Sequence, residues 1–115
     1  MRDESALADV VVGGDEARAT LRPERAAELC RGHFPGNPIV PGALLVGVMA
    51  ELASRLAAGA DRAPLAIVRA TFLRSVHPDG VTTLAATRDG ERITVEVRAA
   101  GAVAARATFR FGDPA

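Results

Sequence analysis

Alternating apolar and polar residues indicate β-strands near both ends of the chain. From Val10 to Arg22 the alternation surrounds a Gly13-Gly14-Asp15 turn, which predicts a hairpin or strand pair at the first edge of a sheet. Similar runs predict four further strands, over residues 65–72, 81–88, 92–99 and 102–111. The turn signals between them are Pro78-Asp79-Gly80, Asp89-Gly90 and Gly101. We expect the last three strands to form an antiparallel meander, because Asp-Gly favours the positive φ of two-residue hairpin turns.

A long helix is predicted between the first strands and the later ones. Residues 43 to about 58 are good helix formers without proline, and Gly59 is placed to end the helix. The first two turns are apolar all round, so we expect that end to be buried on every side. Before it, residues 33–42 hold three prolines and two glycines, which predict a tight, rigid loop. Residues 23–30 fit either a short helical turn or an irregular segment.

The order of these elements predicts an α+β fold in which an antiparallel sheet wraps one long central helix. The chain of 115 residues is the size of one domain, so we expect a single domain over residues 1–115 with one core. One small sheet does not cover the whole apolar circumference of such a helix, and each outer strand exposes an edge. Both observations predict a dimer.

Composition narrows the classes of function. The chain is 49% apolar and only 3% aromatic, and its 14 acidic and 14 basic residues balance. A soluble globular domain with a core of Ala, Val and Leu follows, and nucleic-acid binding is not expected. The longest apolar stretch, residues 38–50, is too short to span a membrane. Cys30 is the only cysteine, so no intramolecular disulfide is expected, and the N-terminal residues show no basic segment followed by an apolar one, as a secretory leader would have. A cytoplasmic location is therefore the default expectation.

His33 and Gly42 are the strongest candidates for chemistry. Histidine changes charge near neutral pH and acts as a general base, while the free amides of a helix N-terminus stabilise a developing oxyanion. The rigid loop places His33 just before the helix, and Gly42 lies where the first free amides begin. The alternative is a loop histidine that simply hydrogen-bonds to backbone.

Two segments resemble a known family. The string GHFPGNPIVPGALL, residues 32–45, resembles the active-site segment of hot-dog 3-hydroxyacyl-carrier-protein dehydratases of the FabZ type. A second string, IVRATFLRSVHPDG, residues 67–80, is similar to the family's strand that leads into a Val-x-Pro-Gly-Asp-like turn. The resemblance covers about residues 8–112. It implies a hot-dog domain that pairs into a double-hot-dog dimer.

The resemblance also implies a mechanism. His33 would remove the α-proton of a 3-hydroxyacyl thioester, the Gly42 amide would bind the thioester oxygen, and the β-hydroxyl would leave as water. Pro41, with the other loop prolines, would hold this geometry, and we expect Phe34 in the core or the pocket wall. The family needs no cofactor, because an acyl carrier protein presents the substrate on phosphopantetheine. That carrier protein is therefore an expected partner.

The chain departs from the family at the second catalytic group. Family members carry an acid on the central helix that helps to expel the hydroxyl, and the matching position here is Gly47. General acid catalysis contributes roughly 10²–10⁴ in rate. Glu51, one turn further on, either replaces the acid or makes a structural hydrogen bond near the dimer interface. A heterodimer, with a related hot-dog subunit supplying the acid, explains Gly47 more simply than a homodimer. Gly47 would then also leave room for an acyl chain.

Other residues carry weaker signals. His77 lies in a turn and is expected to be exposed, and Cys30 either lines the pocket or reacts with oxidants. Two histidines and one cysteine scattered in this way do not predict a metal site. Arg69 and Arg74 either face a phosphopantetheine phosphate or an acidic carrier protein, or are simply solvated. Phe72 is expected in the core or the pocket wall.

Three functions remain on these grounds. The favoured one is a dehydratase acting on carrier-bound 3-hydroxyacyl groups in fatty-acid, polyketide or polyene biosynthesis. The second is a non-catalytic hot-dog subunit or acyl-carrier-binding scaffold that lost turnover at Gly47. A hot-dog thioesterase is less favoured, because those enzymes generally use a helix carboxylate to activate water, and the first two helical turns contain none.

Overall fold

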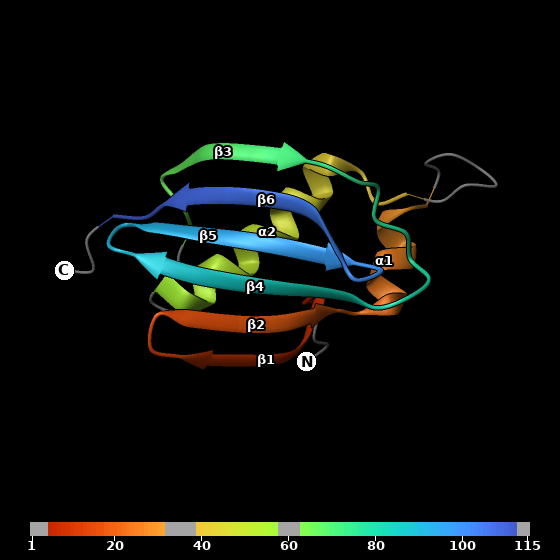
Figure 1. Cartoon of the computed structure of the whole chain (residues 1–115), viewed down its shortest axis with the longest axis horizontal. Helices are drawn as coiled ribbons and strands as arrows, with labels where there is room; N and C mark the ends of the chain where they lie inside the picture. The colour runs from red at the N-terminus through yellow and green to blue at the C-terminus, as the bar shows by residue number, and fades with distance from the viewer. Residues whose placement is uncertain (1–4, 32–38, 58–62, 113–115) are drawn as a thin grey trace.

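In the residues that the structure describes, the fold combines a six-stranded sheet with two helices (Figure 1). The structure is a computed structural model, and it describes residues 5–31, 39–57 and 63–112. The elements in chain order are β1 (Leu7–Gly13), β2 (Glu16–Leu21), α1 (Pro23–Leu29), α2 (Gly42–Ala57), β3 (Ala66–Phe72), β4 (Thr82–Asp89), β5 (Arg92–Ala99) and β6 (Ala102–Arg110). The predicted strands and the long helix are confirmed within a few residues. The segment whose structure the sequence left open forms helix α1.

All strand pairs are antiparallel, and the order across the sheet is β1-β2-β4-β5-β6-β3. The predicted meander of the last three strands is confirmed as β4-β5-β6. Strand β1 forms one edge, as the hairpin pattern predicted, and β3 forms the other (Figure 1). Among the strands that the structure describes, β3 pairs only with β6, so its outer side is an open strand edge in that part of the chain.

The hairpin between β4 and β5 differs from the prediction by one residue. Asp89 still pairs with Arg92, so the two loop residues are Gly90 and Glu91 rather than Asp89 and Gly90. Of these two, Gly90 takes positive φ, at 64°. A turn with glycine at its first central position needs positive φ there alone. Gly90 therefore occupies the first central position of the turn, whereas the sequence signal placed it at the second.

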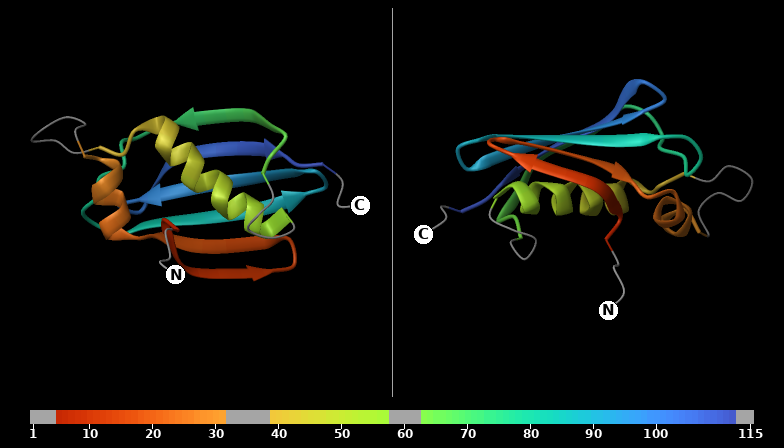
Figure 2. Two further views of the ribbon diagram at one scale, coloured as in Figure 1. Left: turned by 180° about the vertical axis from the view of Figure 1, so that it is seen from behind. Right: turned by 90° about the horizontal axis from the view of Figure 1, so that it is seen from below.

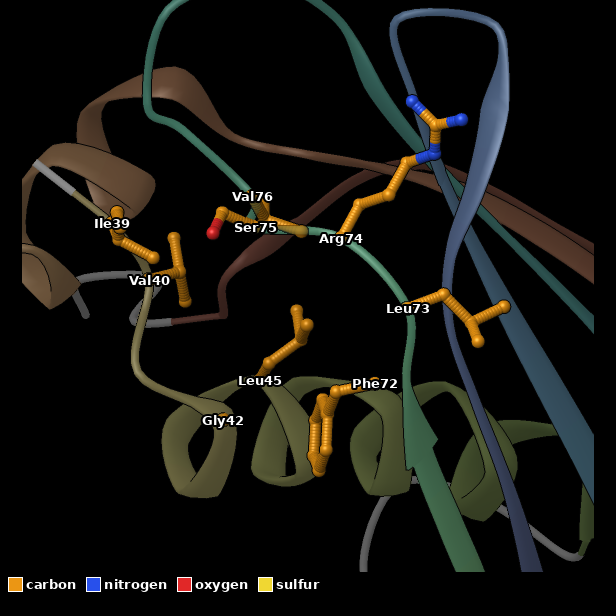
Figure 3. A pocket seen from close by; sticks show the side chains of 9 residues that line it. All are labelled: Ile39, Val40, Gly42, Leu45, Phe72, Leu73, Arg74, Ser75 and Val76. Carbon is orange, nitrogen blue, oxygen red and sulfur yellow. The ribbon is translucent and has the colours of Figure 1, made fainter.

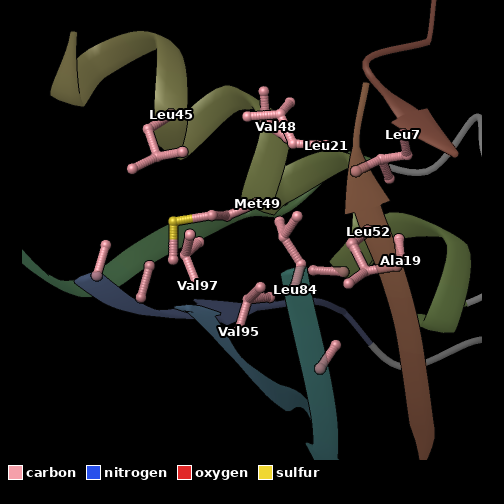
Figure 4. Packing of buried hydrophobic residues seen from close by; sticks show 14 of the residues in the cluster. Leu7, Ala19, Leu21, Leu45, Val48, Met49, Leu52, Leu84, Val95 and Val97 are labelled. Atoms are coloured by element: carbon pink, nitrogen blue, oxygen red, sulfur yellow. The ribbon is translucent and has the colours of Figure 1, made fainter. Parts of the chain in front are cut away.

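Helix α2 lies against one face of the sheet and crosses it diagonally (Figure 2). It packs mainly on β5, β2 and β4. The core between helix and sheet consists of fully buried aliphatic side chains, shown in part in Figure 4, among them Met49, Leu52, Leu84, Val95 and Val97. At the end of the helix, Arg88 Nη1 donates a 3.3 Å hydrogen bond to the carbonyl of Ala57. This contact ties the last turn of α2 to β4.

The first turns of α2 are covered on one side only. Leu45 and Val48 are buried, but Leu44 is 41% exposed and Gly47 is also exposed. The expectation that these turns are buried on every side is wrong for the chain by itself, because a single sheet shields one face of a helix. No helix within the described ranges has the length and apolar character needed to cross a membrane.

Candidate functional site

Two segments distant in the sequence meet at the N-terminus of α2. The Val40 amide donates a 2.8 Å hydrogen bond to the carbonyl of Val76, which joins the residues before α2 to the connection after β3. The Leu45 amide donates to the carbonyl of Pro41 at 2.9 Å, so the helical hydrogen bonds begin at that residue. The amide of Gly42 therefore has no acceptor within the helix. It contributes to the partial positive charge at this end of α2.

A cavity of about 340 Å³ opens at this helix N-terminus. Its walls come from the segment before α2, from α2 itself and from the connection after β3, and the lining residues are Ile39, Val40, Gly42, Leu45, Phe72, Leu73, Arg74, Ser75 and Val76. Figure 3 shows Val40 and Leu45 extending into the space between α2 and the connection after β3. The cavity is thus mostly apolar, with a helix N-terminus at its wall.

Phe72 and Gly42 are in close contact within this wall. A Cβ atom added at Gly42 would lie 3.2 Å from Phe72 Cζ and 3.3 Å from Phe72 Cε1. Figure 3 shows the aromatic ring lying against the helix. The sequence indicated Gly42 only because its backbone amide can bind an oxyanion. The structure adds a steric reason for a glycine at this position. Phe72 is 48% exposed, so it forms a pocket wall rather than part of the core.

The position matched to the family acid is open. Gly47 is exposed, and a Cβ added there would meet nothing within 4 Å. Glu51, by contrast, is held by its own chain. The hydroxyl of Ser5 donates to Glu51 Oε2, and Arg55 Nη2 donates to the same oxygen at 3.3 Å. Glu51 does not line the cavity at Gly42, and these contacts favour the structural interpretation of its carboxylate.

The structure describes only part of the predicted site. His33 and Phe34 lie outside the described residues, and their roles stay predictions. Pro41 is half-buried and immediately precedes the first helical residue, Gly42. Gly47 lies on the same helix, on a surface that the chain leaves uncovered.

Cys30 belongs to a different cavity. Its side chain is 4% exposed and lines a hollow beside Glu28, Arg31 and Pro78. Burial raises the pKa of the Cys30 thiol above its ordinary value of 9.0, which disfavours the reactive thiolate. This environment does not favour Cys30 as a nucleophile.

Arg74 lies on the wall of two cavities, a position that the sequence did not reveal. Besides the cavity at Gly42, it lines a second one of about 370 Å³ with Ser75, His77 and Asp79. His77 is exposed, in agreement with the expectation for a turn. Arg69 is exposed on β3 and lines neither cavity. Only tertiary structure shows which of the two arginines lines a cavity, because their residue type is the same.

Comparisons with known proteins agree with this fold and with the sequence resemblance. A family model described as ApeI-like, ApeI dehydratase, matches residues 10–108. A 3-hydroxyacyl-(acyl-carrier-protein) dehydratase FabZ from Lactobacillus helveticus is 35% identical over 100 residues, which cover 76% of this chain and 68% of that protein. The FabZ of Rickettsia felis is 39% identical over 71 residues, covering 56% of this chain and 49% of that protein. The chain thus spans about half to two thirds of the length of these relatives.

Solved structures share the architecture. The dehydratase heterocomplex ApeI:P from Xenorhabdus doucetiae aligns with a TM-score of 0.73 and 20% identity, over 88% of this chain and 90% of that one. An uncharacterized protein from Erwinia carotovora aligns with a TM-score of 0.67 and 17% identity, over 94% of this chain and 93% of that one. At these identities the likeness shows the hot-dog fold.

Proposed function

The chain belongs to the ApeI-like dehydratase family, and from this premise we propose that it converts 3-hydroxyacyl thioesters on an acyl carrier protein to 2-enoyl thioesters. The observation that carries this proposal is the apolar cavity against the amide of Gly42, which has no acceptor within the helix. The FabZ relatives, named for this reaction, support it. The substrate arrives on its carrier's phosphopantetheine, so the reaction needs no cofactor of the enzyme.

The cavity suits the electronic demands of the reaction. Removing the α-proton places negative charge on the thioester oxygen, and an amide at a helix N-terminus stabilises that charge. We assign this role to Gly42 and the role of base to His33. The β-hydroxyl then leaves as water, which requires a proton from an acid. Val40, Leu45 and Phe72 would contact the apolar acyl chain.

The acid is proposed to come from a related hot-dog subunit. Gly47 offers no proton, and the Glu51 carboxylate already accepts hydrogen bonds from Ser5 and Arg55. The ApeI:P structure is named as a heterocomplex of a dehydratase, which supports the same arrangement here. The chain would then supply His33 and Gly42, and its partner the carboxylate.

The partner is proposed to lie along β3 and the first turns of α2. Strand β3 has an open edge, and apolar side chains are exposed on it and beside it, namely Leu44, Leu65, Ile67, Val68, Phe72 and Leu73. Such a surface is typical of a buried interface. A second subunit there would form a double-hot-dog dimer and bring its central helix close to the cavity at Gly42.

The test is turnover of a 3-hydroxyacyl carrier protein by the purified chain, with and without a Glu- or Asp-bearing hot-dog subunit. We expect enoyl product only in the mixture, and its loss with His33→Ala, because both groups are needed to move the proton and expel the hydroxyl. Native mass spectrometry should show a one-to-one complex in the same mixture. Absence of product in every pairing would refute the dehydratase.

A non-catalytic scaffold is the second candidate function, and the open position at Gly47 is the observation that favours it. Gly47→Glu distinguishes the scaffold from the dehydratase, because a Cβ atom at this position meets no atom of the described residues within 4 Å. If the homomer retains its base, the added acid should raise dehydration by as much as about 10²-fold. Gly47→Gln is the matched control without a proton to donate. A scaffold predicts no gain with Glu and normal complex assembly with His33→Ala.

A further inference from the structure

The two cavities on either side of Arg74 differ in character. The cavity at Gly42 is walled mainly by aliphatic and aromatic side chains. The second, which we call the polar cavity, contains Arg74, Ser75, His77, Asp79 and Thr82 beside small and aliphatic residues. Arg74 and Ser75 contribute to both walls. A cavity with mainly aliphatic and aromatic side chains and a cavity with charged and hydroxyl side chains are therefore adjacent and share one boundary.

The backbone at this boundary is held in place. The amides of Leu73 and Arg74 both donate to the carbonyl of Ala104, at 2.8 and 3.1 Å. Figure 3 shows the Arg74 side chain directed away from Phe72, toward the hairpin that joins β5 and β6. Within the described ranges its guanidinium makes no hydrogen bond or ion pair. A fixed backbone thus presents a cation to the polar cavity.

The guanidinium of Arg74 is the group in the polar cavity that favours an anion. Asp79 is the only acidic residue among the described residues that line this cavity. Arginine presents planar donors that match phosphate oxygens. A phosphate near the guanidinium would be stabilised by Arg74 and opposed by Asp79, so the two side chains should have opposite effects on its binding.

We propose that the polar cavity binds the phosphodiester of the substrate's pantetheine arm through Arg74, while the acyl thioester occupies the cavity at Gly42. The proposal rests on the proposed function, whose substrate has an apolar acyl group at one end and a phosphodiester further along its arm. Arg74 is therefore a substrate-binding residue for the arm.

Binding of unreactive ligands tests this assignment without turnover. Saturated acyl thioesters of pantetheine and of 4′-phosphopantetheine differ only in the phosphate, and calorimetry measures each dissociation constant in the assembly in which the chain is isolated. Arg74→Gln should weaken the phosphorylated ligand about three- to tenfold and leave the unphosphorylated ligand unchanged. Asp79→Asn should tighten the phosphorylated ligand alone.

Arg69→Gln is the matched control, because Arg69 is an exposed arginine on the preceding strand, β3, and lines neither cavity. Equal losses with Arg69→Gln and Arg74→Gln would overturn the subsite and point to general surface charge. So would equal losses for both ligands with Arg74→Gln.

Coenzyme A and carrier-protein thioesters identify which phosphate is recognised. The Arg74 effect should appear with both, since both contain the arm's phosphate ester. An effect confined to coenzyme A would show that its nucleotide phosphates are bound instead, and would refute the proposal. If Arg74→Gln weakens the phosphorylated ligand as expected but the assembly does not dehydrate its substrate, the proposed reaction is refuted and the phosphate subsite stands. If the assembly dehydrates its substrate but Arg74→Gln does not weaken the phosphorylated ligand, the subsite is refuted and the reaction stands.

Discussion

The two halves of helix α2 differ in how their own chain treats them. In the first half, Leu44 and Gly47 are exposed, and Gly42 lines a cavity. In the second half, Leu52 is fully buried and Glu51 is tied to Ser5 and Arg55. One continuous helix therefore combines an end that the described residues cover on one side only with an end that anchors the fold.

This difference separates residues that stabilise the chain from residues available for ligands or partners. A buried aliphatic residue in the second half adds to stability through apolar area removed from water. A small or apolar residue on the open side of the first half adds little until something covers it. Substitutions in the two halves should therefore be detected by different measurements, stability for one and activity or assembly for the other.

Truncating one leucine in each half should give the largest contrast. Leu52 is 0% exposed, and Leu52→Ala should lower the free energy of unfolding by about 2–5 kcal/mol, because it leaves a cavity in the core. Leu44→Ala should cost less than about 1 kcal/mol in the isolated chain. Urea unfolding at low protein concentration measures both. Equal losses would show that the first half is also buried in solution.

Replacing each glycine of the first half by alanine should separate Gly42, which contacts Phe72, from Gly47, which is open. Gly42→Ala places Cβ 3.2 Å from Phe72 and must shift the ring slightly, so we expect dehydration to fall about threefold. Gly47→Ala meets nothing and should raise stability by up to about 1 kcal/mol, because glycine is a poor helix former. Steady-state kinetics of the active assembly and thermal unfolding report the two effects.

The companion change Phe72→Leu tests the cause of the Gly42→Ala loss. The smaller side chain removes the clash, so the double variant should recover part of the lost rate. A further loss in the double variant would mean that Phe72 is needed for another reason.

Glu51→Gln should act on stability rather than turnover. Its side chain is 29% exposed and its contacts are with Ser5 and Arg55, so we expect a loss of about 1 kcal/mol. Dehydration by the active assembly should change less than about threefold. Combining it with Arg55→Gln in a double-mutant cycle should show that the two losses are not additive. A hundredfold fall in turnover with normal stability would make Glu51 the missing acid.

We expect the smallest change in stability at Glu96, which lies on the sheet and away from both halves of α2. The hydrogen bond from Arg106 Nη2, at 2.8 Å, lowers the pKa of Glu96 below its ordinary 4.5, and Arg98 adds to this while partial burial opposes it. A lowered folded-state pKa stabilises the chain above about pH 4.5, and the gain is lost as the pH falls through the folded value. Glu96→Gln should cost under about 1 kcal/mol at neutral pH.

Urea unfolding at neutral pH and near pH 3 checks this prediction. Wild type and Glu96→Gln should differ at neutral pH and converge in acid, because both then lack the charge at this position. A difference that persists unchanged in acid would assign the effect to packing. Neither pH should alter the contrast between the two leucine variants.

The strand pattern and the motif segment were sufficient to predict most of the fold. Alternation and turn residues predicted the edge hairpin and the β4-β5-β6 meander, because strands that follow one another through tight turns pair locally. The position of β3 beside β6 is a long-range pairing that no local pattern specifies. The hairpin at Gly90 differed by one residue, because Asp-Gly indicates a turn but strand register decides which residues occupy its centre.

The candidate site divides in the same way. The amino-acid sequence by itself indicated the family, the helix N-terminus at Gly42 and the loss of a carboxylate at Gly47, because these depend on residue identity and spacing along one segment. Tertiary structure alone placed Phe72 against Gly42, tied Glu51 to Ser5, and set Arg74 between two cavities. The physical reason is that each of these contacts joins segments far apart in the sequence, whose distance in space depends on how the sheet and helix pack.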